Sequence, residues 1–121
     1  MSLEEMYKEN ILYLYKNPLN KKDLVDFDIC EEGINQMCGD EIKIKIKFEN
    51  DKVVDVGFVG DGCAISQAAT SLLTDFIKGK TKEEILKIKD EDVLKMLGIE
   101  ISHTRIKCAM LGKNTIQKSI K

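Results

Sequence analysis

The hydrophobic positions of this chain follow two periods, and the change from one period to the other separates helical segments from extended ones. Residues 3–16 place apolar side chains three or four positions apart, as an amphipathic helix does; these are Leu3, Met6, Tyr7, Ile11, Leu14 and Tyr15. The following segment, Asn17-Pro18-Leu19-Asn20, ends this helix, because a proline disfavours the helical conformation in the residue before it.

Residues 41–49 contain alternating isoleucine and lysine, which predicts a strand with one apolar face. The apolar face carries Ile42, Ile44, Ile46 and Phe48, and the charged face carries Lys43, Lys45 and Lys47. After a tight turn at Asn50-Asp51, the valine-rich segment 52–59 returns as the second strand of an antiparallel hairpin with one solvated face. The lysine row is then either that solvated face or a docking surface for an acidic partner. A short extended segment around 25–29 is a candidate third strand.

Helical spacing returns at residues 63–78, directly after Gly60-Asp61-Gly62. Small and apolar side chains share one predicted face of this helix, namely Ala64, Ala68, Leu72 and Phe76. Gly79 suits the C-terminal cap of the helix.

Three further helical segments are predicted in the last third of the chain. Residues 81–84 have the spacing of a capping box, which predicts a short helix. Asp90 or Asp92 begins another helix, and Gly98 closes it. Residues 104–120 form the last helix, with Ile106, Met110, Ile116 and Ile120 near one face.

The order of these segments, one helix, then strands, then a run of helices, predicts an α+β fold. We expect a small antiparallel sheet of about three strands with the helices packed on one face. The chain has 121 residues and a mass of 13.7 kDa, and it shows no internal repeat or linker. We therefore expect one domain over residues 1–121.

The charge balance excludes some classes of partner. Nineteen basic residues against twenty-one acidic ones leave a formal charge of −2, which argues against a nucleic-acid binder, whose affinity rests on cationic contacts to phosphate. No apolar run approaches the ~20 residues that a membrane span needs. The N-terminus is acidic and carries no signal-peptide pattern. We expect a cytoplasmic protein without nucleic-acid or membrane partners.

Four cysteines carry the candidate chemistry: Cys30, Cys38, Cys63 and Cys108. Stable disulfides are rare in a reducing compartment, so the alternatives are buried inert thiols, metal ligands or reactive thiols. Cys38 precedes Gly39-Asp40, where a tight backbone can bring the thiol and the carboxylate to one side. Cys63 lies at a predicted helix N-terminus, which favours the thiolate, and Cys108 has cationic neighbours.

Three thiolates and one carboxylate, from Cys38, Cys63, Cys108 and Asp40, form a plausible tetrahedral set for zinc or iron. The chain has no CxxC pair, so these ligands would be held together by the fold rather than by a local knuckle. On spacing alone, metal binding and inert thiols remain equally open.

Four segments taken together resemble the IscU/SufU/NifU N-terminal family of iron–sulfur cluster assembly scaffolds. They are Tyr15-Lys16-Asn17-Pro18-Leu19-Asn20, Cys38-Gly39-Asp40, Gly60-Asp61-Gly62-Cys63-Ala64-Ile65-Ser66 and Arg105-Ile106-Lys107-Cys108. The resemblance runs in order from about Tyr7 to Ile120. It implies a SufE/NifU-like α+β fold in which the three cysteines and the aspartate cluster at one exposed end.

The resemblance also implies a role for each of these residues. Cys38, Asp40, Cys63 and Cys108 would hold a transient [2Fe–2S] cluster, and Cys108 would accept persulfide sulfur. The carboxylate of Asp40 would make the cluster labile, because a hard oxygen ligand holds iron less firmly than a thiolate does. The implied partners are a cysteine desulfurase and recipient apoproteins, with a homodimer possible in the cluster-loaded form. Such a protein is a scaffold rather than an enzyme.

Two departures from the family pattern keep an alternative open. IscU proteins usually carry histidine at the position of Lys107, and lysine there resembles SufU proteins. The interval from Cys63 to Cys108, however, is the shorter one that resembles IscU. The chaperone-binding Leu-Pro-Pro-Val-Lys motif of IscU is absent. The alternative is a zinc-bound sulfur-transfer partner of a cysteine desulfurase, and a purely structural zinc domain is a third.

Several neighbouring residues allow two interpretations each. Lys107 either stabilises a thiolate or is a surface lysine. Arg105, the only arginine, either pairs with Asp40 or a persulfide anion or lies at the surface. His103 is expected to be exposed rather than a ligand, and Cys30 to be a bystander thiol.

Overall fold

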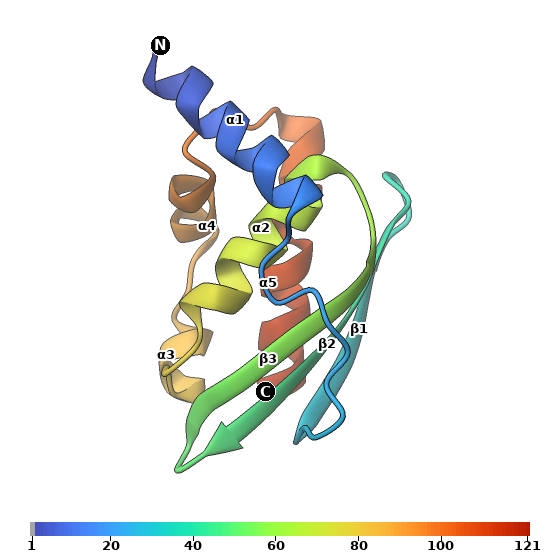
Figure 1. Ribbon diagram of the computed structural model, residues 1–121, viewed down its shortest axis with the longest axis vertical. Helices are drawn as coiled ribbons and strands as arrows, with labels where there is room; N and C mark the ends of the chain where they lie inside the picture. Colours follow the sequence, from blue (N-terminus) through green and yellow to red (C-terminus); the bar gives the residue numbers. More distant parts are fainter. Residues whose placement is uncertain (1) are drawn as a thin grey trace.

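A three-stranded antiparallel sheet and the helices on one side of it make up the computed structural model, which describes residues 2–121 (Figure 1). The elements are α1 (Leu3–Lys16), β1 (Ile29–Asn35), β2 (Asp40–Glu49), β3 (Lys52–Asp61), α2 (Ala64–Phe76), α3 (Lys82–Leu86), α4 (Asp90–Leu97), the short 3₁₀ helix η1 (His103–Arg105) and α5 (Ile106–Ile120). The strand order is β1-β2-β3, so β2 is central. The predicted α+β architecture is confirmed.

Strands β2 and β3 form the hairpin that the alternating pattern predicts. The inward side chains of Ile42, Ile44 and Ile46 are fully buried, which explains why the isoleucines alternate with lysines. Asn50 and Asp51 both have positive φ angles, the backbone geometry that suits a two-residue hairpin turn to the twist of its strands.

Strand β1 lies later in the chain than predicted. The expected third strand around 25–29 is wrong, because Val25 is almost fully exposed and the strand begins only at Ile29. The positions of β1 that share a face with the isoleucines of β2 are Ile29, Glu31, Gly33 and Asn35, of which only Ile29 is apolar. Helix α5 packs against this face so closely that a Cβ at Gly33 would overlap Thr115. The strand therefore has no apolar alternation for the sequence to reveal.

The predicted solvated face of the hairpin is also wrong, because the chain itself covers it. We call residues 17–28 the strap; they cross the sheet on the side opposite the helices (Figure 1). Lys45 pairs with Asp23 at 2.7 Å and Lys47 with Asp26 at 2.6 Å, while Leu24 of the strap is buried. The acidic partner of Lys45 and Lys47 in the lysine row is thus a segment of the same chain.

Helix α2 is buried on more sides than its sequence pattern indicates. Ala68 is buried as predicted, but Phe76 is exposed, and the apolar contacts come from Leu73 and neighbouring Ala69. The helix lies between α1 and α5 and also contacts β3 of the sheet. Two buried threonine hydroxyls on it bond to its own backbone, since Thr70 Oγ1 donates to the carbonyl of Ser66 and Thr74 Oγ1 donates to that of Ser71. The hydroxyls of Ser66 and Ser71 are also buried but have no hydrogen-bond partner among the described residues. The two threonines therefore occupy core positions without a free hydroxyl donor.

The ends of the later helices follow their predicted signals. Thr81 and Glu84 form the capping box of α3. Lys89 is the N-cap of α4, its N–H donates to the carboxylate of Asp92, and Gly98 ends the helix in the left-handed conformation. Within residues 2–121, none of the helices has the length and apolar character that crossing a membrane requires.

Candidate metal centre

The turn between β1 and β2 carries the first candidate ligand. Residues 36–39 connect the strands, and Asn35 and Asp40 are the last pair opposite each other across the hairpin. Gly39 has a φ of +68°, a conformation that glycine adopts without steric cost. Cys38 is half-buried in this turn, and Asp40, the first residue of β2, is fully buried.

The second cysteine begins helix α2. Cys63 is the N-cap residue, and its Sγ accepts a hydrogen bond from the N–H of Ser66 at 3.4 Å. Its own N–H donates to Asp40 Oδ1 at 2.8 Å. Gly62 leaves room for this contact, because a Cβ there would overlap the carboxylate of Asp40. The aspartate thus joins the start of β2 to the start of α2.

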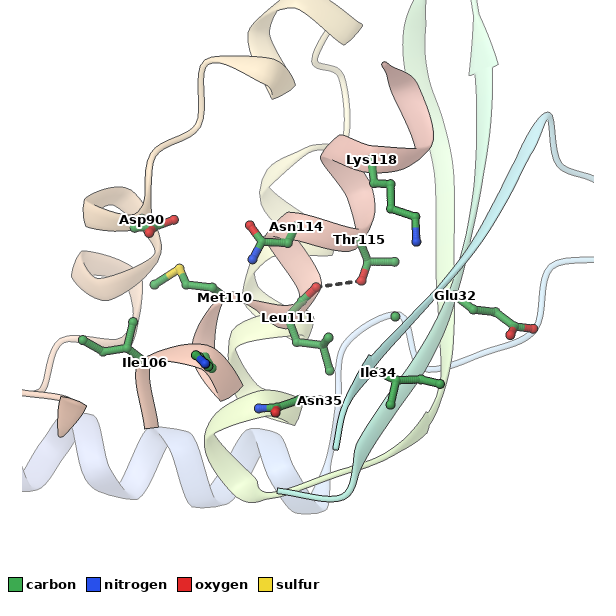
Figure 2. Close-up of a pocket in the computed structure, with 12 residues that line it drawn as sticks. Glu32, Ile34, Asn35, Asp90, Ile106, Met110, Leu111, Asn114, Thr115 and Lys118 are labelled. Carbon is green, nitrogen blue, oxygen red and sulfur yellow. Dashed lines mark hydrogen bonds between the residues drawn. The ribbon is translucent and has the colours of Figure 1, made fainter. Parts of the chain in front are cut away.

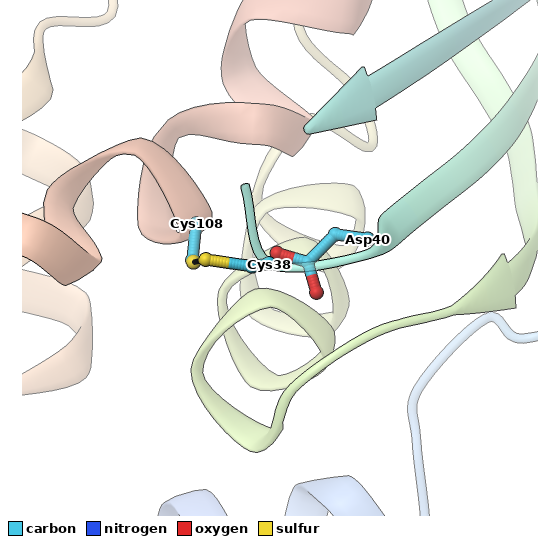
Figure 3. A group of neighbouring side chains, drawn as sticks. All are labelled: Cys38, Asp40 and Cys108. Carbon is cyan, nitrogen blue, oxygen red and sulfur yellow. Dashed lines mark hydrogen bonds between the residues drawn. The ribbon is translucent and has the colours of Figure 1, made fainter. Parts of the chain in front are cut away.

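The third cysteine, Cys108, lies in the first turn of α5 and is fully buried. Its thiol donates to Cys38 Sγ at 2.6 Å, and the side-chain amide of Asn35 donates to its Sγ at 3.6 Å. Single donor atoms of Cys38, Asp40 and Cys108 all lie within 4.8 Å of one another. Figure 3 shows the two sulfurs meeting, with the carboxylate of Asp40 beside them.

The structure therefore brings together three of the four predicted ligands directly. The thiol of Cys63 is not in the 4.8 Å group; it caps its own helix, although its backbone contacts Asp40. The site is also less open than the resemblance implies, because Asp40 and Cys108 are both buried. The half-buried Cys38 is the most accessible member of the group.

The electrostatics of the group favour a bound cation. Burial raises the pKa of the Cys108 thiol far above its ordinary value, and Cys38, Asp40 and Cys63 raise it further. Asp40 Oδ2 is buried and has no hydrogen-bond partner among the described residues. A buried carboxylate oxygen without a partner is costly, and a cation at this point would satisfy it. Two thiols and a carboxylate are a donor set that suits zinc or iron.

The other residues singled out in the sequence lie outside this group. His103 and Arg105 are exposed in η1, and Lys107 is exposed in the first turn of α5. Cys30 is exposed on β1, opposite Lys45 of the neighbouring strand. These positions agree with the expected exposure of His103 and with Cys30 as a bystander.

Asn35 is the residue at this site that sequence reasoning missed. Its only signal in the chain is its place three residues before Cys38, and this has meaning only once the hairpin pairs it with Asp40. Asn35 also lines a groove of about 480 Å³ between β1 and α5, together with Lys107 and Met110 (Figure 2).

Comparison with known proteins gives consistent matches over the whole chain. A family model described as the NifU-like N terminal domain matches residues 6–121. The zinc-dependent sulfurtransferase SufU of Bacillus subtilis is 33% identical over an alignment of 136 positions, gaps included, that covers 98% of this chain and 92% of that protein. The iron-sulfur cluster assembly scaffold protein IscU of Thermotoga maritima is 34% identical over an alignment of 137 positions, gaps included, that covers 100% of this chain and 96% of that protein.

Solved structures agree with these matches. The crystal structure of a putative iron-sulfur cluster assembly scaffold protein for the SUF system from Fervidobacterium islandicum superposes with a TM-score of 0.82 at 30% identity, covering 99% of this chain and 100% of that one. The N-terminal part of a nitrogen-fixing NifU-like protein from Brucella abortus gives a TM-score of 0.78 at 19% identity, covering 97% and 93%, and shares the fold.

Proposed function

The chain belongs to the family of NifU-like N-terminal domains, and from that premise we propose that it is a scaffold on which iron–sulfur clusters are assembled and from which they are passed on. Relatives named as cluster assembly scaffolds and as a SufU sulfurtransferase share about a third of its residues along almost the whole chain. These matches agree with the resemblance carried by the four sequence segments described above, three of which contain a cysteine. We propose that residues 1–121 act as one scaffold domain.

The observation that carries the proposal is the convergence of Cys38, Asp40 and Cys108 around a buried, unpartnered carboxylate oxygen. We propose these three residues, with Cys63, as the ligands of a [2Fe–2S] cluster that is cargo. Cys63 would have to turn its Sγ away from the N–H of Ser66 to join them. The carboxylate supports release, because oxygen holds iron less firmly than sulfur does.

Sulfur transfer would use Cys108 as the acceptor. Its thiolate attacks the outer sulfur of a persulfide on the donor cysteine, a new S–S bond forms on Cys108, and the donor leaves as a thiolate. Attack requires the thiolate, whereas the environment of Cys108 favours the thiol. Loss of its proton must therefore accompany a change at the site, such as the arrival of a cation or of the donor. The proposed partners are a cysteine desulfurase and recipient apoproteins in the cytoplasm.

Anaerobic reconstitution with iron and sulfide tests the scaffold function. We expect a [2Fe–2S] absorption spectrum in the wild type and in Cys30→Ser, which removes an exposed thiol outside the group. Cys38→Ser, Cys63→Ser and Cys108→Ser should each lose the cluster or hold it more weakly. An unchanged spectrum in these three variants would overturn the ligand assignment. Sedimentation of the loaded protein tests the expected homodimer.

A second function, zinc-dependent sulfur transfer, is favoured by the identity to the relative named SufU and by Lys107 at the position where IscU proteins carry histidine. Zinc held by the same donors would keep the thiols deprotonated until a partner displaces one of them. Elemental analysis of protein isolated without oxygen separates the two functions. Bound zinc together with faster desulfurase turnover supports transfer, whereas iron with labile sulfide supports the scaffold.

A further inference from the structure

We infer that Asn35 is a positioning residue for Cys108, holding its sulfur in place by an N–H···S hydrogen bond when that sulfur acts as a ligand. This inference rests on the proposed function of the site. It concerns a residue outside the cysteine and aspartate set, and it follows from the geometry of the hairpin and helix α5.

The hairpin fixes where the Asn35 side chain points. Residues directly opposite each other in an antiparallel pair project to the same face of the sheet, and Asn35 lies opposite Asp40. Both side chains therefore face the helices, and Figure 2 shows the Asn35 amide directed away from β1 towards the helices. One cross-strand pair thus supplies a carboxylate and an amide to the same site.

The hydrogen bonds around Cys108 show why this amide matters. Cys108 Sγ gives its proton to Cys38 Sγ and accepts a proton from Asn35 Nδ2, at 3.6 Å. When both thiols lose their protons to bind a cation, the bond between the two sulfurs disappears. The Asn35 amide keeps its protons at any such step, because a carboxamide does not titrate. It is then the side-chain donor that remains on the Cys108 sulfur within residues 2–121.

Such a donor has two physical effects on a ligating thiolate. It fixes the direction of the sulfur, and it withdraws negative charge from it. Outer partners of metal ligands typically contribute about 10–100-fold to metal affinity. Hydrogen bonds to sulfur also help to set the reduction potential of iron–sulfur clusters. Asn35 would therefore tune how firmly the site holds its cargo.

Cobalt(II) is a suitable probe, because its thiolate complexes have charge-transfer bands that report on the bound sulfur. Asn35→Ala removes the donor, and Asn35→Leu replaces it with an apolar side chain of similar size that adds no charge. Asn114→Ala is the matched control, since Asn114 lines the same groove but is exposed on α5. We expect the two Asn35 variants to bind cobalt about 10–100-fold more weakly than the control, with the sulfur-to-cobalt band of Asn35→Ala at lower energy.

The outcomes separate the inference from the function on which it rests. Wild-type cobalt binding with a thiolate band, together with Asn35 variants that match Asn114→Ala in affinity and band energy, would overturn the role of Asn35 alone. Absence of a thiolate band in the wild type would overturn the metal centre and the role of Asn35 together. Should Asn35→Ala not fold, Asn35→Leu carries the same comparison, because it keeps the approximate size of the side chain.

Discussion

The carboxylate of Asp40 accepts a hydrogen bond from the backbone N–H of Cys63 at 2.8 Å, which ties the first residue of β2 to the N-cap of α2. One oxygen of this buried side chain thus has a structural partner, while the other has none among residues 2–121. Asp40 therefore has a role in the fold besides its proposed role in metal binding, and substitutions can distinguish the two.

Asp40→Ala should lose both roles. Removing the acceptor leaves the N–H of Cys63 without its partner, so we expect a loss of about 1–3 kcal/mol in the free energy of unfolding, measured with urea. Asp40→Asn keeps an oxygen that can accept this hydrogen bond, and it should lose less stability. Both variants should bind cobalt more weakly than the wild type. Equal stability of all three proteins would contradict the structural role.

Removal of bound metal should not unfold the protein. The core is built from residues of the sheet and helices, such as Ile46, Leu73 and Ile116, that do not depend on the site. We expect the far-UV circular dichroism of chelator-treated protein to match that of the loaded form, with only the melting temperature lowered. Cooperative loss of structure on chelation would instead support a purely structural zinc domain.

The strap should weaken in acid. Hydrogen bonds from Lys45 and Lys22 hold the pKa values of Asp23 and Asp55, respectively, below their ordinary 3.8. A carboxylate with a lowered pKa contributes stability above its unfolded pKa and loses that contribution as the pH falls through its folded pKa. The two ion pairs should therefore be intact at pH 5 and lost progressively below 3.8.

Melting temperatures between pH 5 and pH 2 check this expectation. The double variant Asp23→Asn, Asp55→Asn should show a shallower decline than the wild type. Glu83→Gln serves as the control, because Glu83 forms its ion pair with Lys87, four positions away along the chain. A slope unchanged by the double variant would show that these pairs add nothing to stability.

Gly98 should tolerate alanine poorly. It has a φ of +72°, and a Cβ there would overlap the ring of Tyr7. Gly79 has a similar φ of +82° but open space around it, so Gly79→Ala measures the cost of the backbone conformation alone, on the order of 1 kcal/mol. Gly98→Ala should lose clearly more stability in urea unfolding. Equal losses would mean that Tyr7 moves aside freely.

Leu72 and Leu73 test which face of α2 is buried. Leu73 is 1% exposed, whereas Leu72 is half-buried. Leu73→Ala should cost about 2–5 kcal/mol because it leaves a cavity, and Leu72→Ala should cost less. The reverse order would support the face that the spacing of Ala64, Ala68, Leu72 and Phe76 predicts.

Much of the fold could be predicted because its signals are local. The isoleucine alternation of β2, the capping box at Thr81 and the glycine at position 98 each act within a few residues. The position of β1 could not be predicted, because after Ile29 its inward positions carry Glu31, Gly33 and Asn35 rather than apolar side chains. The packing of the strap over the lysine row could not be predicted either, because it depends on ion pairs between residues about twenty positions apart along the chain.

The candidate site divides in the same way. Cys38 and Asp40 lie two positions apart, so their proximity could be predicted. Cys108 is a candidate ligand by residue type and cationic neighbours, and the resemblance implies that it lies at the same site. The hydrogen bond from Asn35 to Cys108 spans 73 positions and appears only when α5 packs on β1. The cap formed by Cys63 Sγ is local, but which way that thiol turns depends on the contact of its backbone with Asp40.

The two sulfurs that meet at the site are 70 positions apart along the chain. During synthesis the first thiol emerges from the ribosome long before the second, and no short peptide from this protein contains both. A partly made chain therefore cannot hold metal as a zinc knuckle can, and neither can the unfolded protein. Loading of the proposed metal site would thereby be restricted to molecules that have already folded.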